Sequence, residues 1–120
     1  MKLSNEVRKK IKSILKEYNF TKSKIKCIEI ELKYENDESR IEKLNEIKEY
    51  NESFIFPIEE ALKEMDYKEQ QILKLKYLDT DPKTWSEIGT ILGYSSDYCR
   101  KDILDKCLTK IYSSFKCEKV

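Results

Sequence analysis

The chain has 120 residues, 39% of them charged and 39% hydrophobic, and its formal net charge at pH 7 is +1. Its length fits one domain with a helical extension, and only two glycines and two prolines favour an all-α fold with long, solvent-exposed helices. The sequence carries no secretory leader and no apolar run near the ~18 residues of a membrane span. We therefore expect a cytoplasmic protein without a membrane partner.

Residues 7–32 repeat apolar side chains at alternating four- and three-residue steps, which is typical of a coiled-coil seam. The seam comprises Val7, Ile11, Ile14, Tyr18, Thr21, Ile25, Ile28 and Leu32. Residues 8–26 carry eight basic side chains against one acidic side chain, whereas residues 29–64 carry twelve acidic against five basic. The first segment is therefore predicted to be one long basic helix, and the second an acidic one.

The polar residues 35–39 predict a turn between the two segments, and an apolar stripe resumes over residues 41–65. Opposite charges and a short turn favour a helical hairpin over residues 1–65. Two alternatives remain: the basic helix follows DNA phosphates, or the seam joins two copies in an intermolecular coiled coil. Because Pro57 removes one helical hydrogen bond, we expect a kink or a break at Phe56–Pro57.

Residues 66–120 are predicted to form a second unit. Asp66 and Glu69 have the spacing of a capping box, in which each side chain accepts a hydrogen bond from the other residue's backbone N–H. A helix should therefore begin at Tyr67 and end at residues 79–82, Asp-Thr-Asp-Pro. Its expected apolar face comprises Ile72, Leu73, Leu75 and Tyr77.

Two further helices are expected around a short turn. Thr84 and Glu87 form a second capping box, Gly93 suits a left-handed helix end, and Ser95 is a good cap for the following helix. The expected buried side chains are Ile88, Ile91 and Leu92 in the first helix and Cys99, Ile103, Leu104, Cys107, Leu108 and Ile111 in the second. This pattern is typical of a helix-turn-helix, although any two amphipathic helices joined by a glycine turn share it.

The residue identities favour the DNA-binding interpretation. Two stretches carry these identities. The first is Gln71-Ile-Leu-Lys-Leu-Lys-Tyr-Leu-Asp, and the second is residues 84–100, which contain Thr-Trp-Ser-Glu-Ile-Gly, Leu-Gly-Tyr-Ser and Tyr-Cys-Arg in that order. This combination resembles the fourth region of bacterial sigma factors, and more closely the phage late-gene transcription regulators of the ArpU/RinA type. The resemblance covers roughly residues 66–112 and implies a helix-turn-helix unit like that sigma region. The apolar stripe after Cys99 resumes at Ile103, one residue later than the resemblance implies.

The second helix of the motif normally enters the major groove, so its outward side chains are the candidates for reading DNA. Arg100 is the best candidate for direct readout, because a guanidinium donates two hydrogen bonds to guanine. Tyr98 could meet a thymine methyl group or pack on the turn, and Trp85 could be a core residue or a phosphate contact. The predicted DNA-binding set comprises Lys83, Thr84, Ser95, Ser96, Asp97, Tyr98, Arg100 and Lys101.

Other chemistry has little support in the sequence. Cys27, Cys99, Cys107 and Cys117 lack any C-x-x-C spacing and the chain has no histidine, so we expect neither a metal site nor a cofactor. The buried cysteines should act as small hydrophobic residues. Without histidine, a phosphate-binding glycine loop or an activated nucleophile, an enzyme is not expected.

The resemblance implies a sequence-specific transcription regulator, an activator of phage or prophage late genes. It would bind double-stranded DNA, with host RNA polymerase as its partner. A second copy of the chain is a further candidate partner. Residues 66–120 carry ten basic and nine acidic side chains, so the intrinsic affinity for DNA should be modest. Two alternatives are a small-terminase-like packaging protein, which usually places its DNA-binding motif first, and a helical interaction module that does not bind DNA.

Overall fold

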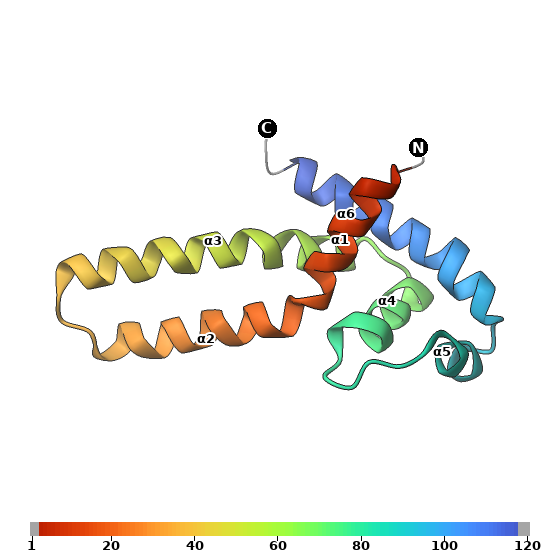
Figure 1. Cartoon of the computed structure of the whole chain (residues 1–120), viewed down its shortest axis with the longest axis horizontal. Helices are drawn as coiled ribbons and strands as arrows, with labels where there is room; N and C mark the ends of the chain where they lie inside the picture. Colours follow the sequence, from red (N-terminus) through yellow and green to blue (C-terminus); the bar gives the residue numbers. More distant parts are fainter. Residues whose placement is uncertain (1–2, 118–120) are drawn as a thin grey trace.

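The computed structural model describes residues 3–117, and within that range all regular secondary structure is helical, with no strand. The α-helices are α1 (Asn5–Lys16), α2 (Tyr18–Tyr34), α3 (Glu38–Lys63), α4 (Tyr67–Leu73), α5 (Trp85–Leu92) and α6 (Leu104–Cys117). There are also two π-helical segments. The first, η1 (Lys74–Leu78), continues α4, and the second, η2 (Tyr98–Ile103), precedes α6; Figure 1 shows the arrangement of the helices. The prediction of an all-α fold is confirmed.

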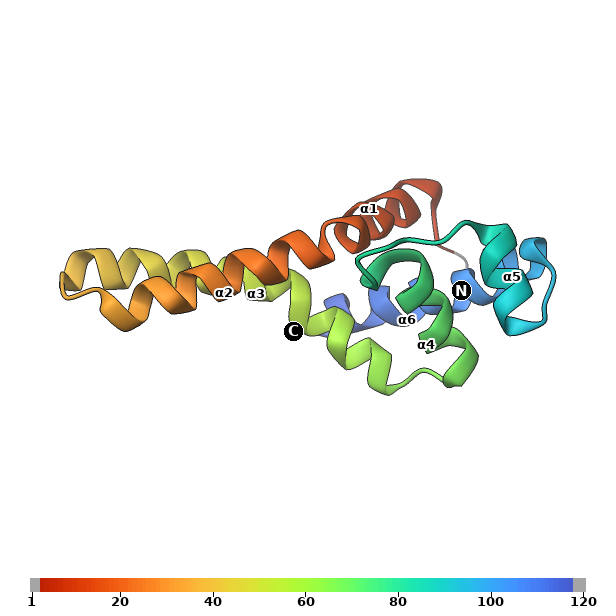
Figure 2. The same ribbon diagram turned by 90° about the horizontal axis from the view of Figure 1, so that it is seen from below.

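The molecule is elongated because α2 and α3 extend together away from the other helices (Figures 1 and 2). Its extents are 54 × 32 × 23 Å and its Cα radius of gyration is 16.6 Å. A compact domain of this length would have a radius near ~13.6 Å. The two paired helices therefore form an arm, with the other helices gathered at its base.

The apolar seam of residues 7–32 is not one helix. The helical path turns at Glu17, which separates α1 from α2 and donates its backbone N–H to the carbonyl oxygens of Ser13 and Ile14, both at 3.2 Å. Beyond this turn α2 pairs with α3, whereas α1 packs on α6 and η1. The prediction of an unbroken seam is wrong, because α1 buries Ile11 and Leu15 against the C-terminal helices instead of continuing along α3.

Charge pairs flank the contact between α2 and α3, as the opposite charges of the two segments predict. Lys22 lies 3.3 Å from Glu59, Glu29 lies 3.5 Å from Lys48, and Glu31 lies 2.9 Å from Arg40. Each pair is at least partly solvent-exposed, so each contributes only ~0–1 kcal/mol to stability. Buried apolar residues such as Ile28, Leu44 and Ile55 must therefore supply most of the stabilisation.

Helix α3 continues through Pro57 without a break, from Glu38 to Lys63. Figure 2 shows the helix changing direction toward its C-terminal end, and the helix is not broken at Phe56–Pro57. Pro57 is buried together with Ile58 and Ala61, and the last two belong to the same buried cluster as Leu108 of α6. We infer that this packing offsets the hydrogen bond that the proline cannot donate.

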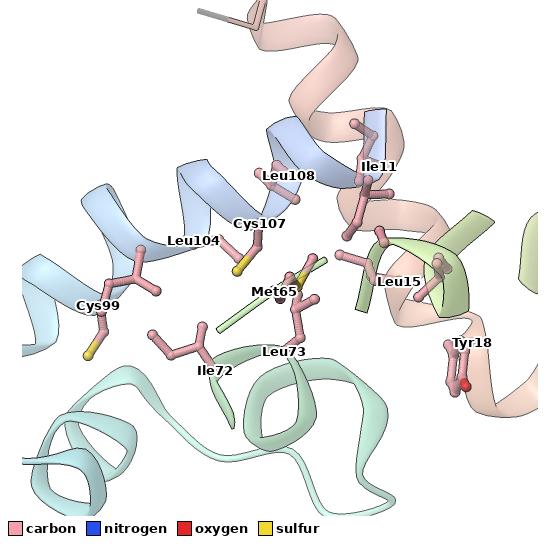
Figure 3. Packing of buried hydrophobic residues seen from close by; sticks show 14 of the residues in the cluster. Ile11, Leu15, Tyr18, Met65, Ile72, Leu73, Cys99, Leu104, Cys107 and Leu108 are labelled. Atoms are coloured by element: carbon pink, nitrogen blue, oxygen red, sulfur yellow. The ribbon is translucent and has the colours of Figure 1, made fainter. Parts of the chain in front are cut away.

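One buried cluster joins the base of the arm to the remaining helices. Figure 3 shows Cys107 and Leu108 of α6, Met65, Leu73 of α4 and Leu15 of α1, which all belong to this cluster. The cluster therefore draws on residues from both sides of the boundary that we predicted at residue 65.

Helix α4 begins as predicted, with a capping box. Asp66 accepts a hydrogen bond from the Glu69 backbone at 3.0 Å, and Glu69 accepts one from the Asp66 backbone at 3.0 Å. The backbone hydrogen bond from Glu69 holds the pKa of Asp66 below its ordinary value. Glu69 is only 2% exposed, and Lys110 Nζ donates to its Oε1 at 2.8 Å, so α6 is fastened to the start of α4.

Cysteine positions agree with their expected role as small apolar residues. Cys99 and Cys107 are fully buried, and burial raises the pKa of the Cys107 thiol to about 12. Cys27 is exposed, whereas the side chain of Cys117 lies outside the described residues.

Within residues 3–117 no cluster of His, Cys, Asp or Glu could hold a metal ion. No helix in that range has the length and apolar character needed to cross a bilayer.

Candidate nucleic-acid interface

Helix α5 starts at a fixed point because both halves of its capping box are formed. Thr84 Oγ1 accepts the Glu87 N–H at 3.2 Å, and Glu87 Oε1 accepts the Thr84 N–H at 3.0 Å. The bond from the Thr84 backbone lowers the pKa of Glu87. Such a box satisfies two N–H groups that the helix itself cannot pair. The predicted start of this helix is confirmed.

Trp85 fastens the start of α5 to the segment before it. Its half-buried ring packs against the main core, and Lys76 Nζ lies 5.0 Å from the ring centre. The same ammonium donates to the carbonyl oxygen of Lys83 at 3.3 Å, and the Lys83 N–H donates to the carbonyl oxygen of Leu75 at 2.9 Å. These contacts support the core interpretation of Trp85. The side chain of Lys83 lies 3.5 Å from Asp81, at the surface.

The turn after α5 depends on both glycines of the chain. Gly93 has φ 79° and ψ 25°, the left-handed conformation that its sequence position predicts. The backbone N–H groups of Gly93 and Tyr94 both donate to the carbonyl oxygen of Gly89, at 2.9 and 3.0 Å. A Cβ atom on Gly89 would lie 2.6 Å from the Tyr94 carbonyl oxygen and 3.2 Å from the Ser96 nitrogen. Gly89 thus lets the turn fold back against the side of α5.

Sequence reasoning missed Gly89, although a signal was present. A glycine inside a predicted helix costs about 1 kcal/mol relative to alanine, so it usually marks a close approach. The prediction that Ile91 belongs to the buried face of α5 is also wrong, because Ile91 is 55% exposed while Ile88 is fully buried. Helix α5 has only eight residues and turns Ile88 and Gly89 inward.

The second helix of the segment begins at Ser96, and Ser95 caps it as predicted. Ser95 Oγ accepts the Tyr98 N–H at 3.1 Å, and the Ser95 carbonyl oxygen accepts the Cys99 N–H at 3.1 Å. The ring of Tyr98 lies 5.3 Å from that of Tyr94, so Tyr98 packs on the turn, one of its two expected positions. Tyr94 itself is 42% exposed.

The first turns of this helix are wider than an α-helix. Residues Tyr98–Ile103 form the π-helical segment η2, in which the Leu104 N–H donates to the carbonyl oxygen of Cys99. A π turn holds one more residue than an α turn, and such turns often occur at functional sites. Cys99 and Ile103 are both buried, as the four-residue spacing of one helix face allows, while the intervening residues 100–102 face solvent.

Arg100 and Asp97 form an ion pair on the exposed side of this helix. Arg100 Nη2 donates to Asp97 Oδ1 at 3.1 Å, and both side chains are largely exposed. This hydrogen bond, together with the charge of Lys101, lowers the pKa of Asp97. Arg100 thus compensates the charge of Asp97 on the exposed side of this helix.

Six of the eight predicted DNA-binding residues are neighbours in the sequence and lie on one short segment of the structure. Ser95, Ser96, Asp97, Tyr98, Arg100 and Lys101 lie on the turn and on the first turns of the second helix. Lys83 and Thr84 precede α5, whose first residue, Trp85, lines the same groove as Arg100 and Lys101. Comparisons of this chain with protein-family models, curated proteins and solved structures give no match.

Proposed function

We propose that this chain is a sequence-specific DNA-binding transcription regulator whose α5, turn and following helix act as a helix-turn-helix of the sigma-region-four kind. The main support is the local geometry: α5 begins at a complete capping box, ends at left-handed Gly93, and precedes a helix capped by Ser95. In this arrangement the second helix is the element that enters the major groove. The exposed side chains of its first turns are then the ones that meet the bases.

Arg100 is the proposed base-reading residue. Its guanidinium is bonded to Asp97 at 3.1 Å in the free protein, which restricts its orientation. An exposed pair of this kind contributes ~0–1 kcal/mol, so guanine O6 and N7 can replace the carboxylate at little cost. Lys101 follows on the same exposed turn and suits a backbone phosphate. The N–H groups at the start of the helix, near Ser96, offer a second phosphate contact.

The biological role follows from the resemblance to regulators of the ArpU/RinA type. We propose that the protein activates late genes of a phage or prophage in the host cytoplasm. Its ligand would be promoter DNA, its partner host RNA polymerase, and two copies would bind together. Residues 66–120 have nearly balanced charge, which supports a requirement for such additional contacts.

Selection of binding sites from a random duplex library, followed by fluorescence anisotropy on the selected site, tests the proposal. Arg100→Ala should weaken binding to the selected site by about 1–3 kcal/mol and relax the preference at one base pair. Lys101→Ala should weaken binding to all duplexes alike. Lys33→Ala removes the same charge at the far end of α2 and is the matched control. Failure to select any sequence, or equal affinities for all four proteins, would contradict the proposal.

A further inference from the structure

A groove of about 510 Å³ separates α1 from the proposed DNA-reading helix. Its charged lining comprises four cations, Arg8, Lys12, Arg100 and Lys101, and two carboxylates, Asp102 and Asp105. Trp85 and Tyr77 contribute aromatic side chains to the same groove. Two elements that are far apart in the sequence thus present their basic side chains to one space.

The turn at Glu17 is what brings α1 to this place. Helix α1 leaves the line of α2 and packs on α6, with Ile11 and Leu15 in the shared core. An ion pair between Arg8 and Asp105 of α6 ties the same helix down beside the groove. The cations of α1 are therefore carried on an element that the fold holds in place.

The carboxylates do not neutralise all of these cations. Asp105 is paired with Arg8, and Asp97 at the edge is paired with Arg100. Lys12, Lys101 and Asp102 form no ion pair within residues 3–117, so two cations and one carboxylate of the groove are unpaired. Burial, and then the nearby charges of Arg8, Lys16 and Arg100, lower the pKa of Lys12. The positive charges thus repel one another in the free protein, and a bound anion would relieve this repulsion.

We propose that α1 is a second DNA-binding element. In this proposal Lys12 contacts a backbone phosphate beside the DNA major groove, which the helix capped by Ser95 reads. This inference rests on the proposed function and adds a binding site outside the helix-turn-helix. The ligand is the sugar-phosphate backbone of duplex DNA, because the groove shares Arg100 and Lys101 with the proposed base-reading surface. Phosphate contacts of this kind fix the position of a protein on DNA without reading its sequence.

Lys12→Gln tests the proposal in the full chain, and Lys10→Gln is the matched control. Lys10 lies on the same helix but lines a different, apolar groove with Val7 and Ile14. Binding to a selected and a scrambled duplex is measured from ~50 to ~200 mM salt. Because one phosphate contact contributes a salt slope of about 0.9, Lys12→Gln should lose about eightfold in affinity at 0.1 M salt on both duplexes. Lys10→Gln should retain the wild-type affinity and slope, and Lys12→Arg should restore both.

Thermal melts show that each variant is folded, and the possible results separate the two proposals. If Arg100→Ala weakens binding while Lys12→Gln behaves like Lys10→Gln, the role of α1 is refuted and the proposed function stands. If the wild-type protein binds no duplex at ~50 mM salt, the proposed function itself fails. The phosphate group bound in the groove could also come from free inorganic phosphate. Titration with inorganic phosphate at constant ionic strength tests this alternative. Lys12-dependent binding of free phosphate, with duplex affinity unchanged in Lys12→Gln, would also overturn the inference.

Discussion

Replacing Gly89 by alanine probes the contact that sets the geometry of the turn. The added Cβ would lie 2.6 Å from the Tyr94 carbonyl oxygen, whereas ordinary contacts begin at 3.4 Å. The turn must therefore move away from α5 by about 0.8 Å, and the obstructing atom belongs to the backbone, which cannot rotate away. The substitution should damage the folded state although alanine is the better helix former.

The magnitude follows from two opposing effects. Overpacking costs ~1–3 kcal/mol, and the higher helix propensity of alanine returns about 1 kcal/mol. The difference is a net loss of up to about 2 kcal/mol, and because the clash is with a backbone carbonyl oxygen we expect the upper half of this range, about 1–2 kcal/mol. At roughly 4 °C per kcal/mol for a chain of this length, Gly89→Ala should lower Tm by about 4–8 °C. Thermal unfolding followed by far-UV circular dichroism measures this change.

Gly93 provides the control, because a side chain there is opposed by the backbone conformation and not by a lack of space. A Cβ there would meet nothing within 4 Å, but the backbone has φ +79°. Gly93→Ala should therefore lose about 1–2 kcal/mol to backbone strain, and Gly93→Asn should recover much of it because asparagine tolerates this conformation. At Gly89, asparagine should give no recovery. A Gly89→Ala protein that melts at or above the wild-type temperature would refute the proposed packing of the turn.

Three other predictions concern packing and titration. Ile88→Ala should cost about 2–5 kcal/mol in a chemical denaturation curve, while Ile91→Ala should stay within ~0.5 kcal/mol of wild type; equal losses would contradict the orientation of α5. Peptide mapping after brief alkylation should find Cys27 modified and Cys107 protected until unfolding, because burial raises the pKa of Cys107 to about 12. The pKa of Glu87 is lowered in the fold, so its stabilisation is complete above the ordinary value of 4.5 and disappears as pH falls through the lower folded value. Glu87→Gln should reduce the acid sensitivity of Tm, and an unchanged pH profile would show that this carboxylate does not contribute.

The sequence predicted those features whose causes lie within a few residues. The capping boxes at Asp66 and Thr84, the left-handed Gly93 and the Ser95 cap all pair backbone groups locally. The ion pair between Asp97 and Arg100 could also have been expected, because residues three apart lie on one helix face. Sequence patterns of this local kind can be recognised without knowing the rest of the fold.

Features that depend on contacts between distant residues could not be predicted from the sequence in this way. The seam of residues 7–32 keeps its period across Glu17, so nothing in the pattern shows that α1 turns to pack on α6. The groove shared by Lys12 and Arg100 depends on this turn and could not be predicted from residues 88 positions apart. In α5, a helix of eight residues, periodicity alone could not decide that Ile88 is buried and Ile91 exposed.

Amide chemical-shift mapping tests the central claim most directly, since it locates bound DNA without altering the protein. A ¹⁵N-labelled chain is titrated with the selected duplex and, separately, with a scrambled one. We predict that the largest shifts fall on residues 95–101 with the selected duplex, and that smaller shifts on α1 occur with both. The far end of the arm, near Tyr34, should not respond. Shifts confined to α2 and α3, or none on residues 95–101, would contradict the assignment of this segment as the DNA-reading element.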